Sequence, residues 1–149
     1  ERQFCSPGFD LPVGCLMRTP PGEYPENHTS ADDLAFVRPG PLADSLRACL
    51  EILAVLDEDG TYVNRSPYGE PQLGRRGLFR GAGGAGARGG AGLPDERALL
   101  WVLSQSDGGP SLLDIATRSG MPFGTIRDAA RALQAVGLLE EAPAAEARA

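Results

Sequence analysis

The sequence predicts two unlike parts, an α/β remnant in the first 80 residues and an all-α module near the C-terminus. The remnant consists of a strand, a loop, a helix and a small hairpin, whereas the module contains three helical patterns within about 45 residues. Between the two parts, residues 81–93 are almost entirely glycine and alanine, a composition that forms flexible linkers. A phosphate-binding glycine loop is the other interpretation of this stretch, but it lacks a preceding buried strand and a Gly-Lys-Ser/Thr motif.

The composition is that of a globular protein with an acidic balance. Of the 149 residues, 42% are hydrophobic and 23% are charged. Because neither a long apolar run nor a secretory signal is present, we expect a cytoplasmic location and no membrane contact. All 14 basic residues are arginine, and 20 acidic residues bring the net charge to -6, which disfavours nonspecific binding to phosphate backbones. The chain begins without methionine in sequence typical of an ordered domain, so we expect it to be a fragment.

The elements of the first part follow from apolar patterns bounded by proline and glycine. Leu11–Arg18 is a short apolar run between such boundaries, which predicts a buried strand. Residues 19–36 have no periodic pattern and form a loop that carries His28, the only histidine. Pro41–Leu56 has the apolar stripe of an amphipathic helix, and residues 61–79 alternate around turn signals, which predicts a small hairpin. The three cysteines form no Cys-x-x-Cys pair, which favours buried structural thiols at Cys5, Cys15 and Cys49.

Three helices and a short strand are predicted after the linker. The first helix carries Trp101, the only tryptophan. The second begins at Ser111, which forms a capping box with Asp114, and it ends at Gly120. The third ends at Gly137. The predicted bounds are 94–105, 111–120 and 121–137 for the helices, 138–141 for the strand and 142–149 for a frayed tail. The predicted apolar positions are Leu99, Leu100, Val102, Leu103, Leu112, Ile115, Ala116, Ile126, Ala130, Leu133 and Val136.

A tight turn joins the last two helices, so that they form a helix-turn-helix, and residues 94–141 as a whole resemble winged-helix domains. In that family the third helix enters the DNA major groove, which implies that Thr125, Arg127 and Arg131 contact nucleic acid or a partner. However, residues 94–149 hold five arginines against eight acidic residues, whereas DNA-binding modules have the opposite balance. We therefore expect a structural or protein-contacting role for the module, with sequence-specific DNA binding as the alternative.

Four pieces follow one another in the first part, namely Glu1–Phe4, Gly8–Pro12, the predicted strand and the motif "HTSAD" at His28–Asp32. In this order they resemble the last metal-binding stretch of the zinc exo-aminopeptidases. The closer resemblance is to bacterial aminopeptidase-like proteins of that superfamily, which are found with polysaccharide-biosynthesis functions and end in a winged helix. Those proteins share "CSPG", "LPVG" and "GEYPE" with this chain, and the resemblance covers nearly all of it except the linker.

The resemblance implies a metal-binding role for the loop. His28 would be the final zinc ligand, and Asp32 would accept a hydrogen bond that orients the loop or the ring. In full-length family members two zinc ions activate a water that hydrolyses an N-terminal peptide or amide bond, so the implied substrate is peptide-like or amine-bearing. The other ligands and the base glutamate precede this stretch in the family. The implied partner is therefore the missing N-terminal portion of the same domain, and the chain alone is expected to hold no catalytic residue and to be inactive.

Two other functions remain open. One is a winged-helix DNA-binding or adaptor protein in which the first part serves only as scaffold. The other is an aminopeptidase-like protein that has lost catalysis and binds carbohydrate-linked amines. Cys5 as a thiol nucleophile is disfavoured, because the only histidine lies far along the chain and no partner group is evident.

Overall fold

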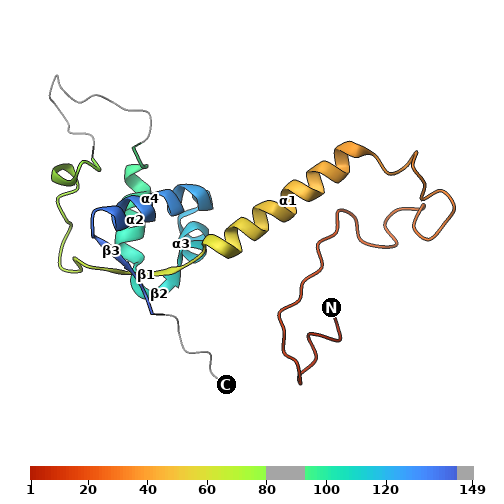
Figure 1. Ribbon diagram of the computed structural model, residues 1–149, viewed down its shortest axis with the longest axis horizontal. Coiled ribbons are helices and arrows are strands. Elements are labelled where there is room, and N and C mark those ends of the chain that lie inside the picture. Colours follow the sequence, from red (N-terminus) through yellow and green to blue (C-terminus); the bar gives the residue numbers. More distant parts are fainter. Residues whose placement is uncertain (80–92, 144–149) are drawn as a thin grey trace. The chain divides into compact units, whose positions relative to one another are not determined.

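The computed structural model describes residues 1–79 and 93–143 of the chain (Figure 1). The chain divides into two compact units, Glu1–Ile52 and Leu53–Ala149. The elements in chain order are α1 (Pro39–Glu58), β1 (Thr61–Asn64), the short 3₁₀ helix η1 (Gly74–Arg76), α2 (Glu96–Gln105), β2 (Asp107–Ser111), α3 (Leu112–Ser119), α4 (Phe123–Ala135) and β3 (Leu139–Glu141). The predicted linker, apart from its last residue, and most of the predicted tail lie outside the described residues.

The first unit consists of turns up to Arg38, followed by the first part of α1, and none of its residues is buried. The predicted strand at Leu11–Arg18 is wrong. The backbone hydrogen bonds of this segment are local. For example, the Leu11 N–H donates to the Phe4 carbonyl at 3.0 Å. A strand is stable only when a neighbouring strand takes up its N–H and C=O groups, and no described segment pairs with this run. The predicted loop at residues 19–36 is confirmed.

Helix α1 confirms the predicted helix Pro41–Leu56 and extends two residues further at each end. Its apolar stripe is not covered, since Leu46, Leu53 and Leu56 remain 61%, 60% and 68% exposed. The predicted burial of the cysteines is also wrong, because the first unit has no buried interior to receive them. All three are exposed: Cys5, Cys15 and Cys49. Neither α1 nor any other helix in the described ranges is long and apolar enough to cross a membrane.

Helices α2, α3 and α4 build the buried core of the second unit (Figure 1). Helix α4 packs against both α2 and α3. Most of the predicted apolar positions are buried, but Leu100 is 39% exposed and Val136 is half-buried. The largest fully buried side chains are Leu99, Val102, Leu112, Ile115, Ile126, Leu133 and Leu138. Because burial of each such side chain contributes about 1.5–3 kcal/mol, this three-helix interior stabilises the unit.

The ends of α3 and α4 follow from local sequence. The predicted capping box is confirmed, as the Ser111 hydroxyl accepts from the Asp114 N–H at 3.2 Å and the Asp114 carboxylate accepts from the Ser111 N–H at 3.0 Å. Gly120 ends α3 with a φ of +68°, and Gly137 follows α4 with a φ of +71°. Glycine adopts this left-handed conformation without the steric cost of a Cβ, so α3 stops where the sequence predicts, whereas α4 stops at Ala135, two residues before the predicted end.

Strand β1 lies between β2 and β3 and is antiparallel to both. Val63 pairs with Asp107 of β2 and with Glu140 of β3. The predicted hairpin at residues 61–79 is therefore wrong, because β1 finds partners far along the chain and η1 follows it instead of a second strand. The predicted strand at 138–141 is confirmed as β3. Strand β2 was not predicted, since its sequence Asp-Gly-Gly-Pro-Ser is typical of turns.

Candidate functional site

His28 lies in the exposed loop between the first turns and α1, with its backbone in the left-handed region at a φ of +60°. Hydrogen-bonded turns flank it, since the Thr29 N–H donates to the Glu26 carbonyl at 3.0 Å and the Tyr24 hydroxyl donates to the Asn27 amide oxygen at 3.3 Å. Histidine is one of the few residues other than glycine that is enriched in this conformation. The loop therefore presents the imidazole on a turn that its own hydrogen bonds define.

Asp32 occupies the same loop, but the structure does not join it to His28. Its N–H donates to the Thr29 carbonyl at 3.2 Å, and no hydrogen bond links the carboxylate to the imidazole. Within residues 1–79 and 93–143, no three His, Cys, Asp or Glu side chains are grouped as a metal site. An imidazole is a suitable zinc donor, yet His28 supplies only one of the four donors that zinc normally takes. Zinc binding at His28, with Asp32 as its support, stays a prediction.

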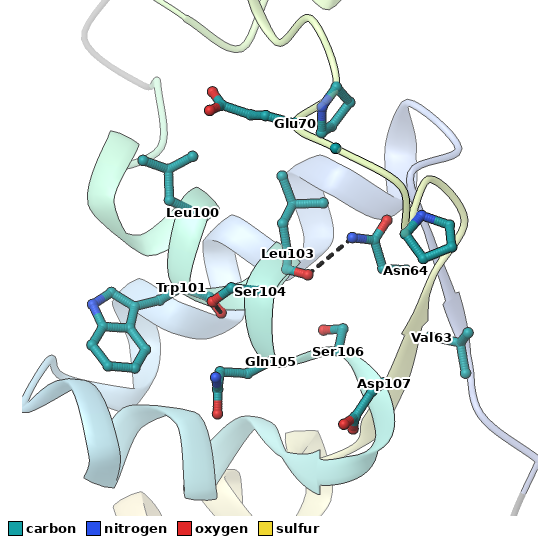
Figure 2. A pocket seen from close by; sticks show the side chains of 13 residues that line it. Val63, Asn64, Glu70, Leu100, Trp101, Leu103, Ser104, Gln105, Ser106 and Asp107 are labelled. Atoms are coloured by element: carbon teal, nitrogen blue, oxygen red, sulfur yellow. Dashed lines mark hydrogen bonds between the residues drawn. The ribbon is translucent and has the colours of Figure 1, made fainter.

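In the second unit, a groove lies between α2 and the loop that follows β1 (Figure 2). Asn64 fixes this loop to the helix, because its amide nitrogen donates to the Leu103 carbonyl at 2.9 Å. The other end of the same amide accepts from the Ser66 N–H at 2.8 Å, so the turn out of β1 is also held. No local pattern predicts this groove, since its two walls come from segments about 40 residues apart along the chain.

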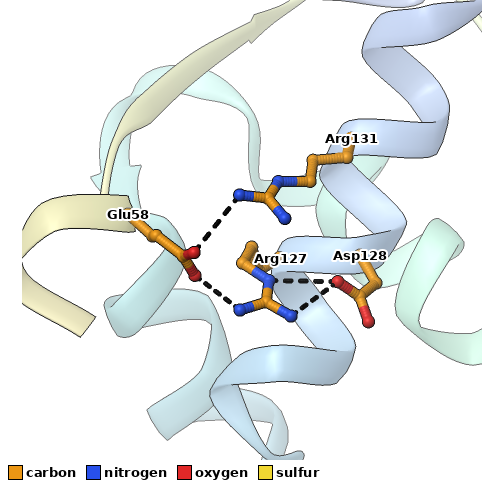
Figure 3. A network of polar contacts seen from close by, with 4 residues as sticks. All are labelled: Glu58, Arg127, Asp128 and Arg131. Atoms are coloured by element: carbon orange, nitrogen blue, oxygen red, sulfur yellow. Dashed lines mark hydrogen bonds and ion pairs between the residues drawn. The ribbon is translucent and has the colours of Figure 1, made fainter. Parts of the chain in front are cut away.

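A network of ion pairs ties α4 to the last turn of α1, and Figure 3 shows its members. Arg127 donates to one Glu58 carboxylate oxygen at 2.5 Å, and Arg131 donates to the other at 3.3 Å. Arg127 also contacts Asp128 through Nε and Nη2, at 3.0 and 2.9 Å. Two of the three residues predicted to contact nucleic acid or a partner are thus paired within their own unit, whereas Thr125 is half-buried and outside the network.

The network also shifts the ionisation of its members. The hydrogen bond from Arg127 lowers the pKa of Glu58, and the same hydrogen bond raises the pKa of Arg127. Helical periodicity identified the two arginines as neighbours on one face, but Glu58 lies about 70 residues away in sequence. The sequence "DED" at residues 57–59 is the signal that could have pointed to a carboxylate there.

We expect Glu58→Gln to flatten the dependence of stability on pH. Because the folded-state pKa of Glu58 lies below its ordinary value of 4.5, its pairing stabilises the fold above that pH, and this stabilisation is lost as the pH falls through the folded-state pKa. Urea unfolding at pH values from about 6 down to about 3 measures the slope. Glu51→Gln, an exposed position on α1, serves as the control and should keep the wild-type slope. If Glu58→Gln also keeps it, the network does not contribute to folding.

Three helices and a small antiparallel sheet, with α3 and α4 joined by a tight turn, define the winged helix-turn-helix class. The family model of winged helix-turn-helix proteins matches residues 60–141, which is more than half of the chain, so the chain belongs to this family. Residues 1–59 match a second model, described as a domain of unknown function (DUF4910).

Two similar proteins come from Clostridium acetobutylicum. One, provisionally named a polysaccharide biosynthesis protein with an aminopeptidase-like domain, is 50% identical over 141 residues, which are 94% of this chain and 31% of that protein. The other is a crystal structure of a protein provisionally called a peptidase, with 44% identity, a TM-score of 0.78, and coverage of 94% of this chain and 29% of that one. The chain thus spans less than a third of the length of either, and the expected similarity to aminopeptidase-like proteins is confirmed.

Proposed function

We propose that this chain is the C-terminal part of an aminopeptidase-like zinc hydrolase that cleaves N-terminal peptide or related amide bonds in its full-length form. The observation that carries the proposal is the 50% identity to the aminopeptidase-like protein of Clostridium acetobutylicum over nearly the whole of this chain. The "HTSAD" loop supports it, since the loop offers an exposed imidazole on a defined turn. The partner of this part is the remainder of the same domain, and the substrate is peptide-like or amine-bearing.

His28 has one role in this proposal, which is to donate an imidazole nitrogen to the metal. Zinc, when bound, would polarise the scissile carbonyl and supply an activated water. Asp32 would support the loop rather than touch the metal. In the family that this chain resembles, the general base and the remaining ligands precede this stretch, so this chain alone is expected to be inactive.

We propose a structural or protein-contacting role for the winged helix. In DNA-binding relatives of this fold, arginines on the third helix of the module meet phosphates and base edges. Here Arg127 and Arg131 pair with Glu58, and the unit carries more acidic than basic residues. Both facts support the proposal that this face of α4 makes contacts within the protein. A winged-helix DNA-binding or adaptor protein remains the alternative, and a catalytically inactive aminopeptidase-like binding protein is the third candidate.

The full-length protein that contains this chain should hydrolyse aminoacyl p-nitroanilides, and a zinc chelator should abolish the activity. The release of p-nitroaniline measures the rate, and re-addition of zinc should restore it because the metal is the source of the activated water. N-acetylated substrates are the matched control, since an aminopeptidase requires a free N-terminus. Bound zinc without turnover of any substrate would favour the catalytically inactive candidate, and chelator-resistant turnover would contradict the zinc mechanism.

We expect the chain not to retard duplex DNA at protein concentrations up to about 10 μM in physiological salt, a range in which nonspecific DNA-binding proteins begin to bind. The physical reason is the acidic balance of the unit together with the pairing of Arg127 and Arg131. Gel retardation with a mixed-sequence duplex measures the binding of DNA to the chain. A Glu58→Gln variant tests whether freed arginines gain DNA affinity. Retardation by the wild-type chain that arginine replacement on α4 removes would favour the DNA-binding alternative.

A further inference from the structure

The groove beside α2 has a volume of about 920 Å³, within the range of small-ligand pockets. Leu100, Trp101 and Leu103 of α2 form its apolar wall (Figure 2), and Pro67 and Pro71 of the loop after β1 also line it. Leu100 is 39% exposed although it belongs to a core helix. The groove therefore offers apolar surface that the rest of the second unit does not cover.

The charged groups that line this groove are all acidic. They are Glu70 and Asp107, and no arginine or histidine of the described residues lines it. One Asp107 oxygen accepts from the Gly109 N–H at 3.0 Å, which leaves the other oxygen free, and the Glu70 carboxylate has no partner among the described residues. In Figure 2 the two carboxylates lie on opposite sides of Leu103. A ligand with positive charge and apolar surface complements this lining, whereas an anion does not.

Ser106 adds a polar group next to Asp107. The residue is only 4% exposed, and its hydroxyl has no hydrogen-bond partner in the described part of the chain. The backbone around it is fully used, because its N–H donates to the Val102 carbonyl at 3.0 Å and its carbonyl accepts from the Asn64 N–H at 2.8 Å. Buried hydroxyls are normally paired, so the Ser106 hydroxyl keeps the capacity to accept a hydrogen bond from a group in the groove.

We propose that this groove binds a cation carried on an apolar body. The ammonium or guanidinium group lies at the end formed by Asp107 and Ser106, and the apolar body lies along Leu103 and Leu100 toward Trp101. A free alkylammonium compound and a basic residue of a peptide share this chemistry. The site belongs to the winged helix and does not depend on the hydrolase proposal.

The 149-residue chain provides its own fluorescent reporter, because its only tryptophan, Trp101, lines the groove. Titration with phenethylammonium should change Trp101 emission saturably. The matched neutral compound 2-phenylethanol should bind at least about threefold more weakly, and 3-phenylpropionate more weakly still, because each lacks the charge that the carboxylates favour. Acetyl-Phe-Lys-amide tests the peptide source. Tighter binding of this peptide than of phenethylammonium assigns the site to peptides, and weaker binding assigns it to small amines.

Variants locate the binding. Asp107→Asn and Ser106→Ala should each weaken the binding of phenethylammonium at least about threefold. Glu51→Gln removes an acidic charge outside the groove, so it should leave this binding unchanged. If Asp107→Asn fails to fold, as judged from its amide NMR spectrum, Glu70→Gln makes the same test at the other end of the groove. The proposal is overturned if the emission change does not saturate, if the neutral compound binds as tightly as the cation, or if Glu51→Gln weakens binding as much as Asp107→Asn.

Discussion

Leu133→Ala is expected to lower the free energy of unfolding of the winged-helix unit by about 3 kcal/mol. Leu133 is fully buried on α4, which packs against both α2 and α3, so the deleted atoms leave a cavity that two neighbouring helices bound. A loss of this size is a large part of the stability of a small domain. Urea unfolding followed by Trp101 fluorescence measures it, since this side chain packs against the same core.

Leu56→Ala is the matched control for this core prediction. It removes the same atoms from a leucine in the last turns of α1 that is 68% exposed. Exposed substitutions usually change stability by no more than about 0.5 kcal/mol, and alanine is also the better helix former. Comparable losses in the two variants would mean that the described core does not hold the unit together.

His28→Ala should reduce the zinc affinity of the full-length protein by more than about 100-fold, because loss of a direct ligand exceeds the 10–100-fold effect of a supporting group. Zinc content after dialysis, measured by atomic absorption, and competition with a chromogenic chelator report the change. The rates of aminoacyl p-nitroanilide hydrolysis should fall in parallel. Since His28 is exposed, the variant should fold normally, and its circular dichroism spectrum checks this.

Two replacements in the same loop separate ligation from loop support. If Asp32 orients the loop or the ring, Asp32→Asn should weaken zinc binding by a smaller factor, about tenfold. Glu23→Gln changes a carboxylate in the same loop that has no predicted role, and it should leave zinc binding unchanged. Full zinc content in His28→Ala would refute the assignment of this residue, whatever the two carboxylate variants do.

Local signals predicted the helices of this chain and strand β3, but they failed for β1 and β2. The capping box at Ser111 and the glycine at 120 act within one turn, so they can be identified in isolation. Strand β1 depends instead on β2 and β3, whose residues lie roughly 45 to 80 positions later. The apolar run at Leu11–Arg18 shows the converse error, because apolar character alone does not supply a neighbouring strand.

The candidate sites divide in the same way. His28 could be identified from a motif of five consecutive residues, although its metal could not be tested within this chain. The arginines of α4 could be placed on one helix face, but their partner Glu58 is remote in sequence. The groove beside α2 could not be predicted, since Ser106 and Glu70 line the same groove only after β1 has taken its place in the sheet.

The central position of β1 has a consequence for any attempt to isolate the winged helix. A truncation that starts at residue 94 would remove β1, the middle strand of the sheet. Strands β2 and β3 would then be unpaired, and unpaired strand edges promote aggregation. Folding also has to close a long chain loop before β1 can pair with β2 and β3. Contacts between residues far apart in sequence lower the folding rate of a protein. A cut before Leu53 would instead keep the strand, its two neighbours and the Glu58 pair in one piece.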